Sequence, residues 1–316
     1  MGIASYIKEI GRGREGARAL TREQAADLMG QVLDGAVTDL EVGAFCLAMR
    51  IKGETPPEMA GFLDATRLRL ALVPNAGQAT VVLPSYNGAR KLPVLTPLLA
   101  LLLAREGLAV LVHGRATESG RTSTQKVLET LGIRAQSAIE SIANGELQYV
   151  PTELLCPGLA RLLDVRRVVG LRNPAHSLVK LLNPCSHTAL LVGSYTHPEY
   201  ARSMAATLQL LQASALLLRG TEGEPVADPR RTPAMDAFTH GDSWRVQEAQ
   251  SGPLAQVPDL PAPDAASTAR WTQAVLDGQQ PVPTPIALQV AHLVALARAA
   301  KQPLPPTPQS PAIPTF

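Results

Sequence analysis

Residues 20–64 read LTREQAADLMGQVLDGAVTDLEVGAFCLAMRIKGETPPEMAGFLD, and this stretch contains three helix-start signals in close succession. Each signal is a threonine followed three residues later by Gln or Glu, which is typical of a capping box at a helix N-terminus. The pairs are Thr21 with Gln24, Thr38 with Glu41, and Thr55 with Glu58. Apolar residues recur at helical spacing after each pair, and Gly35 and Gly53 end the first two segments. The stretch therefore predicts a small bundle of short helices.

The sequence after Pro74 changes to an alternation of strand and helix patterns. A long helix is expected over about 97–106, between the first two of several strand candidates. Those candidates are 80–83, 109–112, 165–169, 188–192 and 214–218. A late helix is expected over 286–300. Strand–helix–strand order is the signature of a parallel α/β sheet.

These patterns predict an α/β protein in which a small N-terminal helical bundle precedes a larger domain with a mostly parallel central sheet. We expect the helical domain over residues 1–74, joined by some helical residues from about 135–185. The α/β domain then covers 75–300, and 301–316 form a Pro-rich tail without fixed structure.

The cysteines and the hydropathy pattern bear on where the protein works. The chain has three cysteines, Cys46, Cys156 and Cys185, an odd number with no metal-like spacing. This favours reduced thiols and a cytoplasmic location. Charged residues interrupt the N-terminal segment, so we expect no signal peptide. The most apolar run, 98–112, is broken at Arg105, which argues against a membrane span.

Positive charge is unevenly distributed. The net charge is only +2, yet residues 155–220 contain 7 basic and 2 acidic residues. A local basic excess favours an anionic partner such as phosphate, nucleotide or nucleic acid, with an ordinary solvated surface as the alternative.

Several motifs resemble the anthranilate phosphoribosyltransferases and the nucleoside phosphorylases of the same fold. The matching segments are GAF at 43–45, KGET at 52–55, HG at 113–114, LETLGI at 128–133, VVGLRNPAHSLVKLLNP at 168–184 and GSYTHPEY at 193–200. The resemblance implies a small helical domain, a larger α/β domain, a cleft between them, and a homodimer joined through the helical domains.

The chemistry of that enzyme family is largely missing. The family's diphosphate loop, Gly-Thr-Gly-Gly-Asp, falls on 84–88, which read Pro-Ser-Tyr-Asn-Gly. Its Lys-His-Gly-Asn-Arg falls on 112–116, where only His113 and Gly114 remain. Its acidic Mg²⁺ pair falls near 225–226, with Glu222, Glu224 and Asp228 close by. We therefore expect a degenerate active site with no catalytic or metal-binding residues and no cofactor, which argues against an enzyme without deciding the question, and we treat His113 as structural. A metal site shifted to the nearby carboxylates is the alternative.

Basic residues stand around the lost motifs, and the resemblance brings many of them to the cleft at the carboxyl ends of the strands. The candidate phosphate-binding residues are Arg90, Lys91, Arg115, Arg121, Arg166, Arg167, Arg172, Lys180, Arg202 and Arg219. Tyr86 and Tyr195 are candidates for stacking on bases, with packing at loop edges as the alternative. Each cation is, on the other reading, an ordinary surface charge or ion-pair partner.

The retained scaffold and the basic residues resemble the YbiB-like branch of the family, which is associated with nucleic-acid binding. This implies a single-stranded DNA or RNA partner, bound mainly through its backbone with little sequence preference. One alternative is a phosphoribosyltransferase-like glycosyltransferase with a remodelled active site, which would need Mg²⁺. Another is a regulatory module that senses a small phosphorylated metabolite. The sequence leaves open whether DNA or RNA is bound.

Overall fold

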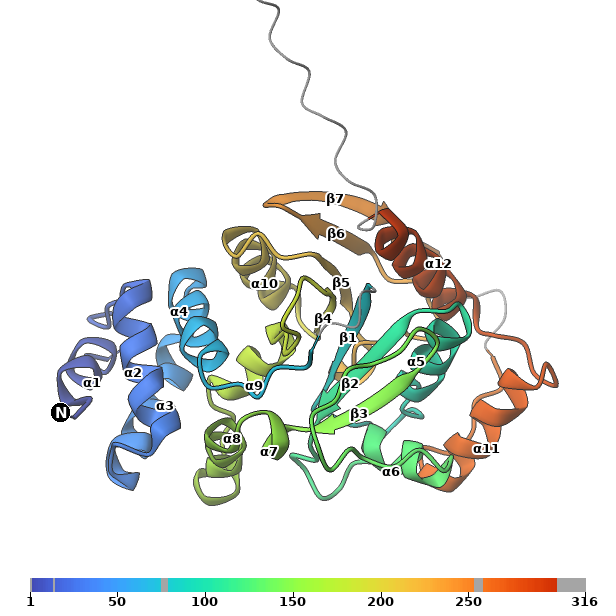
Figure 1. Ribbon diagram of the computed structural model, residues 1–316. Coiled ribbons are helices and arrows are strands. Elements are labelled where there is room, and N and C mark those ends of the chain that lie inside the picture. The colour runs from blue at the N-terminus through green and yellow to red at the C-terminus, as the bar shows by residue number, and fades with distance from the viewer. Residues whose placement is uncertain (1, 14, 75–78, 253–257, 300–316) are drawn as a thin grey trace, which may run out of the picture.

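The computed structural model describes residues 2–13, 15–74, 79–252 and 258–299 (Figure 1). The tail over 301–316 lies outside these residues. The helices are α1 (Ala4–Ile10), α2 (Arg22–Asp34), α3 (Asp39–Lys52), α4 (Pro56–Arg67), α5 (Thr96–Arg105), α6 (Thr124–Thr130), α7 (Thr152–Leu155), α8 (Pro157–Val169), α9 (Ala175–Leu178), α10 (Pro198–Leu210), α11 (Ala265–Leu276) and α12 (Thr284–Ala299). The strands are β1 (Thr80–Ser85), β2 (Ala109–Gly114), β3 (Leu147–Pro151), β4 (Leu190–Tyr195), β5 (Ala215–Arg219), β6 (Met235–Thr239) and β7 (Asp242–Gln247).

The N-terminal helices begin where the sequence predicts. Thr21, Thr38 and Thr55 each cap a helix, and all three capping boxes are present. Gly35 follows α2 in the left-handed conformation, with φ of 70°, which a residue with a Cβ adopts only at a cost. Helix α2 packs against α4 and α8, and α4 also contacts α10 of the sheet domain. The bundle therefore includes a helix from much later in the chain.

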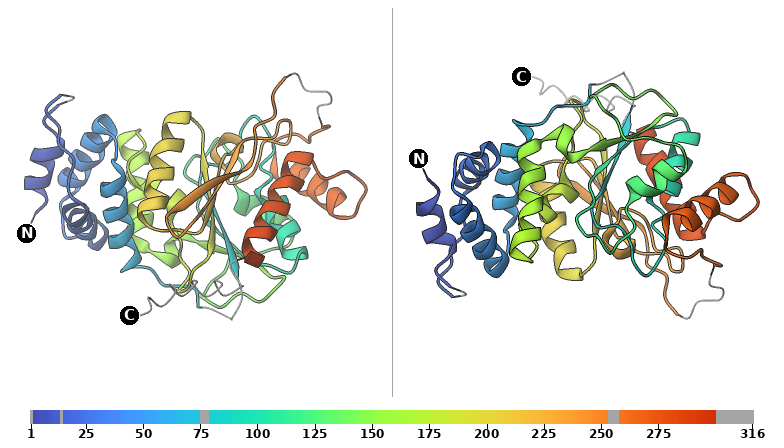
Figure 2. Two further views of the ribbon diagram at one scale, coloured as in Figure 1. Left: turned by 90° about the horizontal axis from the view of Figure 1, so that it is seen from above. Right: turned by 90° about the horizontal axis from the view of Figure 1, so that it is seen from below.

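The sheet has seven strands in the order β3-β2-β1-β4-β5-β6-β7. The pairs among β3, β2, β1, β4 and β5 are parallel, and β6 and β7 add an antiparallel edge. The expected mostly parallel sheet is confirmed. Successive side chains of a strand point to opposite faces, so Val81 and Leu83 join one core while Val82 joins the other. Helices α5, α11 and α12 cover one face, and α8, α9, α10 and the bundle lie on the other (Figures 1 and 2).

One expected strand is wrong. Residues 165–169 form the last turn of α8, although valine at 165, 168 and 169 favours a strand. Pro157 opens this helix, its buried residues recur at helical spacing, and Gly170 ends it with φ of 76°. Packing against α2 outweighs the local preference of the valines. The elements that the sequence analysis does not predict include strand β3, the β6–β7 hairpin and helices α1, α6, α10 and α11.

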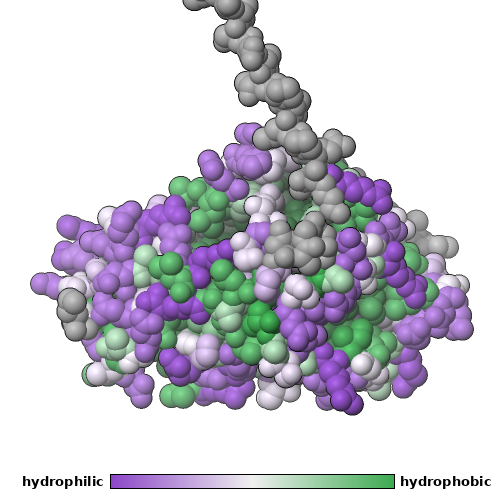
Figure 3. Space-filling model, viewed as in Figure 1, coloured by the Kyte–Doolittle hydropathy of each residue, from purple (hydrophilic) through white to green (hydrophobic). Residues whose placement is uncertain are grey.

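The surface is mixed in character. In Figure 3 the helical end of the molecule is mostly hydrophilic, while hydrophobic residues show over its middle. Among the described residues, no helix is both long and apolar enough to cross a membrane.

Candidate functional site

Strands β1, β2, β4 and β5 are parallel, so their carboxyl ends meet at one edge of the sheet, the usual place for ligand binding in open α/β sheets. The loops that follow β1 and β2 are joined by a backbone bridge. Ala89 and Thr122 donate to each other's carbonyl oxygens at 2.9 Å. The segment after β5, residues 220–224, packs against the β1 loop through two glutamates.

The side chain of Glu224 binds the loop after β1, at the positions that correspond to the family's diphosphate loop. Its Oε1 accepts from the backbone N–H groups of Asn87 and Gly88, both at 2.8 Å. Its Oε2 accepts from the hydroxyls of Ser85, Thr96 and Thr124. The side chain is 1% exposed. A carboxylate of the chain therefore satisfies the donors that would otherwise face an anion.

The carboxylate of Glu222 binds backbone N–H groups of the same loop, a few residues later in the chain. Its Oε1 accepts from the backbone N–H groups of Lys91 at 2.8 Å and Leu92 at 2.9 Å, and Arg90 N lies 3.1 Å from Oε2. Burial alone would raise the pKa of this carboxyl, but these hydrogen bonds and the charge of Arg121 lower it. Glu222 therefore carries its negative charge within the β1 loop.

A third carboxylate, Glu118 in the loop after β2, contacts three arginines. Its oxygens lie 2.7 Å from Arg166, 3.1 Å from Arg172 and 3.1 Å from Arg121. Burial opposes ionisation, yet the hydrogen bonds from Arg166 and Arg172 and the nearby charge of Arg121 prevail and lower the pKa of Glu118 to about 2. Arg121 also contacts Glu222 at 3.2 Å. We call Arg121, Arg166 and Arg172 the arginine cluster; three guanidinium groups there outnumber the carboxylates they share.

Lys180 lies deeper in the same region. Its Nζ donates to the carbonyl oxygens of Gly223 at 3.0 Å and Ser194 at 3.3 Å. Burial lowers the pKa of Lys180 to about 8, with the charge of Glu224 acting in the opposite direction. The Lys180 amine therefore links the 220–224 segment to the end of β4.

The other candidate cations separate into exposed and structural groups. Exposed side chains belong to Arg90, Lys91, Arg167, Arg202 and Arg219. Arg115 instead lies beside α7 and α8: its guanidinium contacts Glu153 at 3.1 Å, Asp164 at 3.0 Å and the carbonyl oxygen of Ala160 at 2.8 Å. Arg115 therefore bridges helices α7 and α8 and pairs with carboxylates other than those of the arginine cluster.

The two tyrosines lie in different settings. Tyr86 is 3% exposed, and its hydroxyl lies 2.8 Å from Nδ1 of His113 and accepts from Thr152 at 3.0 Å. Tyr86 is therefore too buried to stack on a base, and the prediction that it does so is wrong. Tyr195 is half-buried and pairs across the strands with Arg219.

His113 is a buried structural residue. Its Nε2 lies 3.1 Å from the carbonyl oxygen of Leu182, and its Nδ1 faces Tyr86. Burial lowers the pKa of His113 to about 3. The imidazole is therefore neutral at pH 7, with Nε2 as donor and Nδ1 as acceptor, and this agrees with the structural role expected from the sequence.

The low pKa of His113 predicts acid sensitivity. Below pH 6.5 the histidine of the unfolded chain takes up a proton that the folded protein does not, so folding stability falls as the pH falls. Between pH 7 and 5 this one residue contributes a loss of about 2 kcal/mol. Urea unfolding of His113→Gln should show a loss from pH 7 to 5 that is smaller by that amount. The exposed His197→Gln is the control; an equal loss in all three proteins would contradict the assignment.

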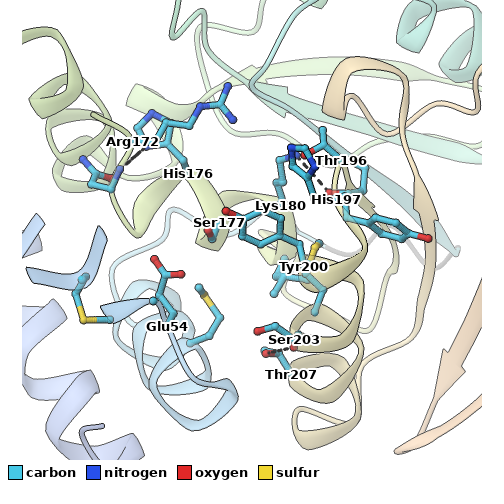
Figure 4. Close-up of a pocket in the computed structure, with 18 of the residues that line it drawn as sticks. Glu54, Arg172, His176, Ser177, Lys180, Thr196, His197, Tyr200, Ser203 and Thr207 are labelled. Carbon is cyan, nitrogen blue, oxygen red and sulfur yellow. Dashed lines mark hydrogen bonds between the residues drawn. The ribbon is translucent and has the colours of Figure 1, made fainter. Parts of the chain in front are cut away.

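A pocket of about 310 Å³ lies between the helical bundle and the sheet domain (Figure 4). Glu54 points into it from the bundle side, and Arg172, His176, Lys180 and Tyr200 border it from the sheet domain. Burial raises the pKa of Glu54, which favours its neutral form. Burial also lowers the pKa of His176 to about 3, and its Nε2 has no hydrogen-bond partner among the described residues. The pocket can take a small molecule that offers a polar atom.

Comparison with known proteins identifies the family to which this architecture belongs. The helical bundle domain of the glycosyl transferase family matches residues 4–69. The uncharacterized protein YbiB of Escherichia coli K12 is 38% identical over 309 residues, covering 95% of this chain and 96% of its own. The chain belongs to the anthranilate phosphoribosyltransferase-like family. A relative from Idiomarina loihiensis named anthranilate phosphoribosyltransferase is 28% identical, with 82% of this chain and 79% of its own covered.

Solved structures of the anthranilate phosphoribosyltransferase-like family share the fold. The anthranilate phosphoribosyltransferase of Thermus thermophilus superposes with a TM-score of 0.70 at 22% identity, with 93% of each chain covered. The Saccharomyces cerevisiae enzyme in complex with PRPP and Mg superposes with a TM-score of 0.66 at 15% identity, covering 94% of this chain and 89% of its own.

The residues at this site do not fit a Mg²⁺ ion. The oxygens of Glu222 and Glu224 already accept hydrogen bonds from the β1 loop. Asp228 pairs with Arg230 at 2.8 Å. The described part of the chain contains no group of three His, Cys, Asp or Glu side chains arranged for a metal. Sequence reasoning missed Glu118, which stands in no recognisable motif, and considered Glu222 only as a possible ligand of a shifted metal site.

Proposed function

We propose that the protein binds single-stranded nucleic acid through its phosphate backbone, at the carboxyl edge of the sheet. One observation carries the proposal: Arg121, Arg166 and Arg172 converge on Glu118, and Arg121 continues through Glu222 to the segment bearing Arg90 and Lys91. Three guanidinium groups thus contact two carboxylates, and the exposed side chains of Arg90 and Lys91 belong to the segment whose backbone binds one of them, Glu222. A strip of this kind attracts a polyanion without a metal.

Arginine suits this task because its planar guanidinium can grip a phosphate bidentately and stack on a base. Arg167, Arg202 and Arg219 are further exposed cations of the sheet domain. Tyr195 pairs with Arg219 across the strands, and the exposed part of its half-buried ring is available for stacking on a base. Backbone contacts of this kind carry little sequence information, so we infer weak sequence preference.

Fluorescence anisotropy of a labelled single-stranded oligonucleotide, at several salt concentrations, tests the proposal. Phosphate contacts release counterions, so binding should weaken steeply as salt rises. The absence of binding at low salt would remove nucleic acid as the partner.

We also propose a homodimer joined through the helical domain. Helix α3 exposes an apolar stripe formed by Leu40, Leu47 and Ile51, which are 84%, 46% and 62% exposed. Leu47 and Ile51 also line a shallow apolar surface together with Ile7 and Ile10 of α1. A second copy of the chain would cover this stripe.

The dimer makes a direct prediction. The double variant Leu47→Glu with Ile51→Glu should sediment as a 33.5 kDa monomer, because two buried charges cost several kcal/mol at an interface. Sedimentation equilibrium measures the mass. Leu68→Glu, at the end of α4, is an exposed control that should remain dimeric. A wild-type protein that is monomeric at micromolar concentration would contradict the proposal.

A second candidate is a phosphoribosyltransferase-like glycosyltransferase. The pocket of about 310 Å³ and the names of several relatives favour it. Titration calorimetry with phosphoribosyl diphosphate and Mg²⁺ tests this second candidate, because the absence of any heat of binding would exclude it. We place either activity in the cytoplasm, and the three free, buried cysteines support a reducing compartment.

A further inference from the structure

Glu222 reaches the β1 loop through an unusual turn. Its own φ is 51°, in the left-handed region, and Gly223 follows with φ of 87°. The positive φ strains any other residue at 223, and a Cβ there would also lie 2.0 Å from Nδ2 of Asn87, so this position favours glycine. A non-glycine residue in this conformation costs free energy unless its surroundings compensate. The three backbone hydrogen bonds from the β1 loop to the Glu222 carboxylate supply that compensation.

The donors that hold Glu222 form a cradle for an oxyanion. Three consecutive N–H groups, at residues 90–92, donate to the two oxygens of the Glu222 carboxylate, and the Arg121 guanidinium lies 3.2 Å from Oε2. Successive backbone amides beside an arginine are the usual means of holding a phosphate group. This cradle lies outside the five positions, 84–88, that correspond to the family's diphosphate loop.

We propose that residues 90–92 and Arg121 form a phosphate-binding site that Glu222 closes from within the chain. Glu222 is a built-in competitor whose carboxylate takes the place of the phosphate group. Its side chain is 16% exposed, so an ion can reach the cradle once the carboxylate leaves. Glu224 is 1% exposed and stays in place. The proposal does not depend on nucleic-acid binding, because the cradle is complete in the chain itself.

Calorimetric titration with inorganic phosphate tests the site in the full-length protein. Glu222→Ala should bind phosphate at least about tenfold more tightly than wild type, because charge-assisted hydrogen bonds become available to the ion. Its melting temperature should rise with added phosphate, as linkage requires. Adding Arg121→Ala to this variant should reverse the gain. Glu199→Ala removes one exposed carboxylate from α10 without opening the cradle and should behave as wild type.

A second variant keeps the test decisive if Glu222→Ala does not fold. Glu222→Gln retains the size of the side chain and one acceptor oxygen while removing the charge, so it should fold and bind phosphate with intermediate affinity. Phosphate-dependent folding of Glu222→Ala would also support the site. Equal affinity for phosphate in wild type and Glu222→Gln, or no binding by any folded variant, would overturn the proposal.

Discussion

Replacing Arg90, Lys91 and Arg172 together by alanine is expected to weaken the binding of a single-stranded oligonucleotide about 100-fold at roughly 0.1 M salt. Each lost phosphate contact lowers the dependence of log K on log salt by about 0.7 for single strands, so three contacts account for a change of about 2 in the slope. Arg90 and Lys91 are exposed, and their backbone N–H groups, which bond Glu222, remain in the variant. The fold should therefore survive, and anisotropy at four salt concentrations gives both the affinity and the slope.

The matched control removes the same charge elsewhere. Arg18, Arg134 and Arg270 are exposed and lie outside the loops at the carboxyl edge of the sheet. Their triple alanine variant changes net charge equally and should lose only a small part of the affinity. If both triple variants lose affinity to the same extent, binding follows overall charge, and the arginine cluster has no special part in it.

The choice of residues for this test differs from what the sequence alone would suggest. Lys180 stands in a motif that the sequence singles out, but its amine bonds two carbonyl oxygens inside the protein. Its removal would disturb the 220–224 segment, so a loss of binding would be ambiguous. Arg115 likewise bridges α7 and α8. Sequence identifies basic residues, but only packing distinguishes those that hold the fold from those that face solvent.

The fold was more predictable than the site for a physical reason. Capping boxes and apolar periodicity are local signals, so the starts of α2, α3 and α4 could be read directly. The side-chain partners of Glu222 and Glu224 in the loops after β1 and β2 lie 100 to 139 residues away in the chain. Such pairings depend on how β5 lies relative to β1, which no local pattern encodes. The buried position of Tyr86 follows from the same arrangement.

Glu224→Ala is expected to lower the free energy of unfolding by about 3–5 kcal/mol, because it removes a buried charged acceptor from several donors at once. The N–H groups of Asn87 and Gly88 and the hydroxyls of Thr96 and Thr124 would lose their partner. Urea denaturation at pH 7 measures the change. Glu199→Ala, on the exposed side of α10, should change stability by less than about 0.5 kcal/mol.

Glu224→Gln separates the contribution of the charge from that of the hydrogen bonds. The amide oxygen can still accept from both backbone N–H groups, and the hydroxyls can rotate to accept from its NH₂ group. We therefore expect a smaller loss, about 1–2 kcal/mol. If the Ala and Gln variants both unfold like wild type, the carboxylate does not hold the β1 loop. If both lose the full amount, the negative charge itself is required, and this edge of the sheet is built around an anion that the chain supplies.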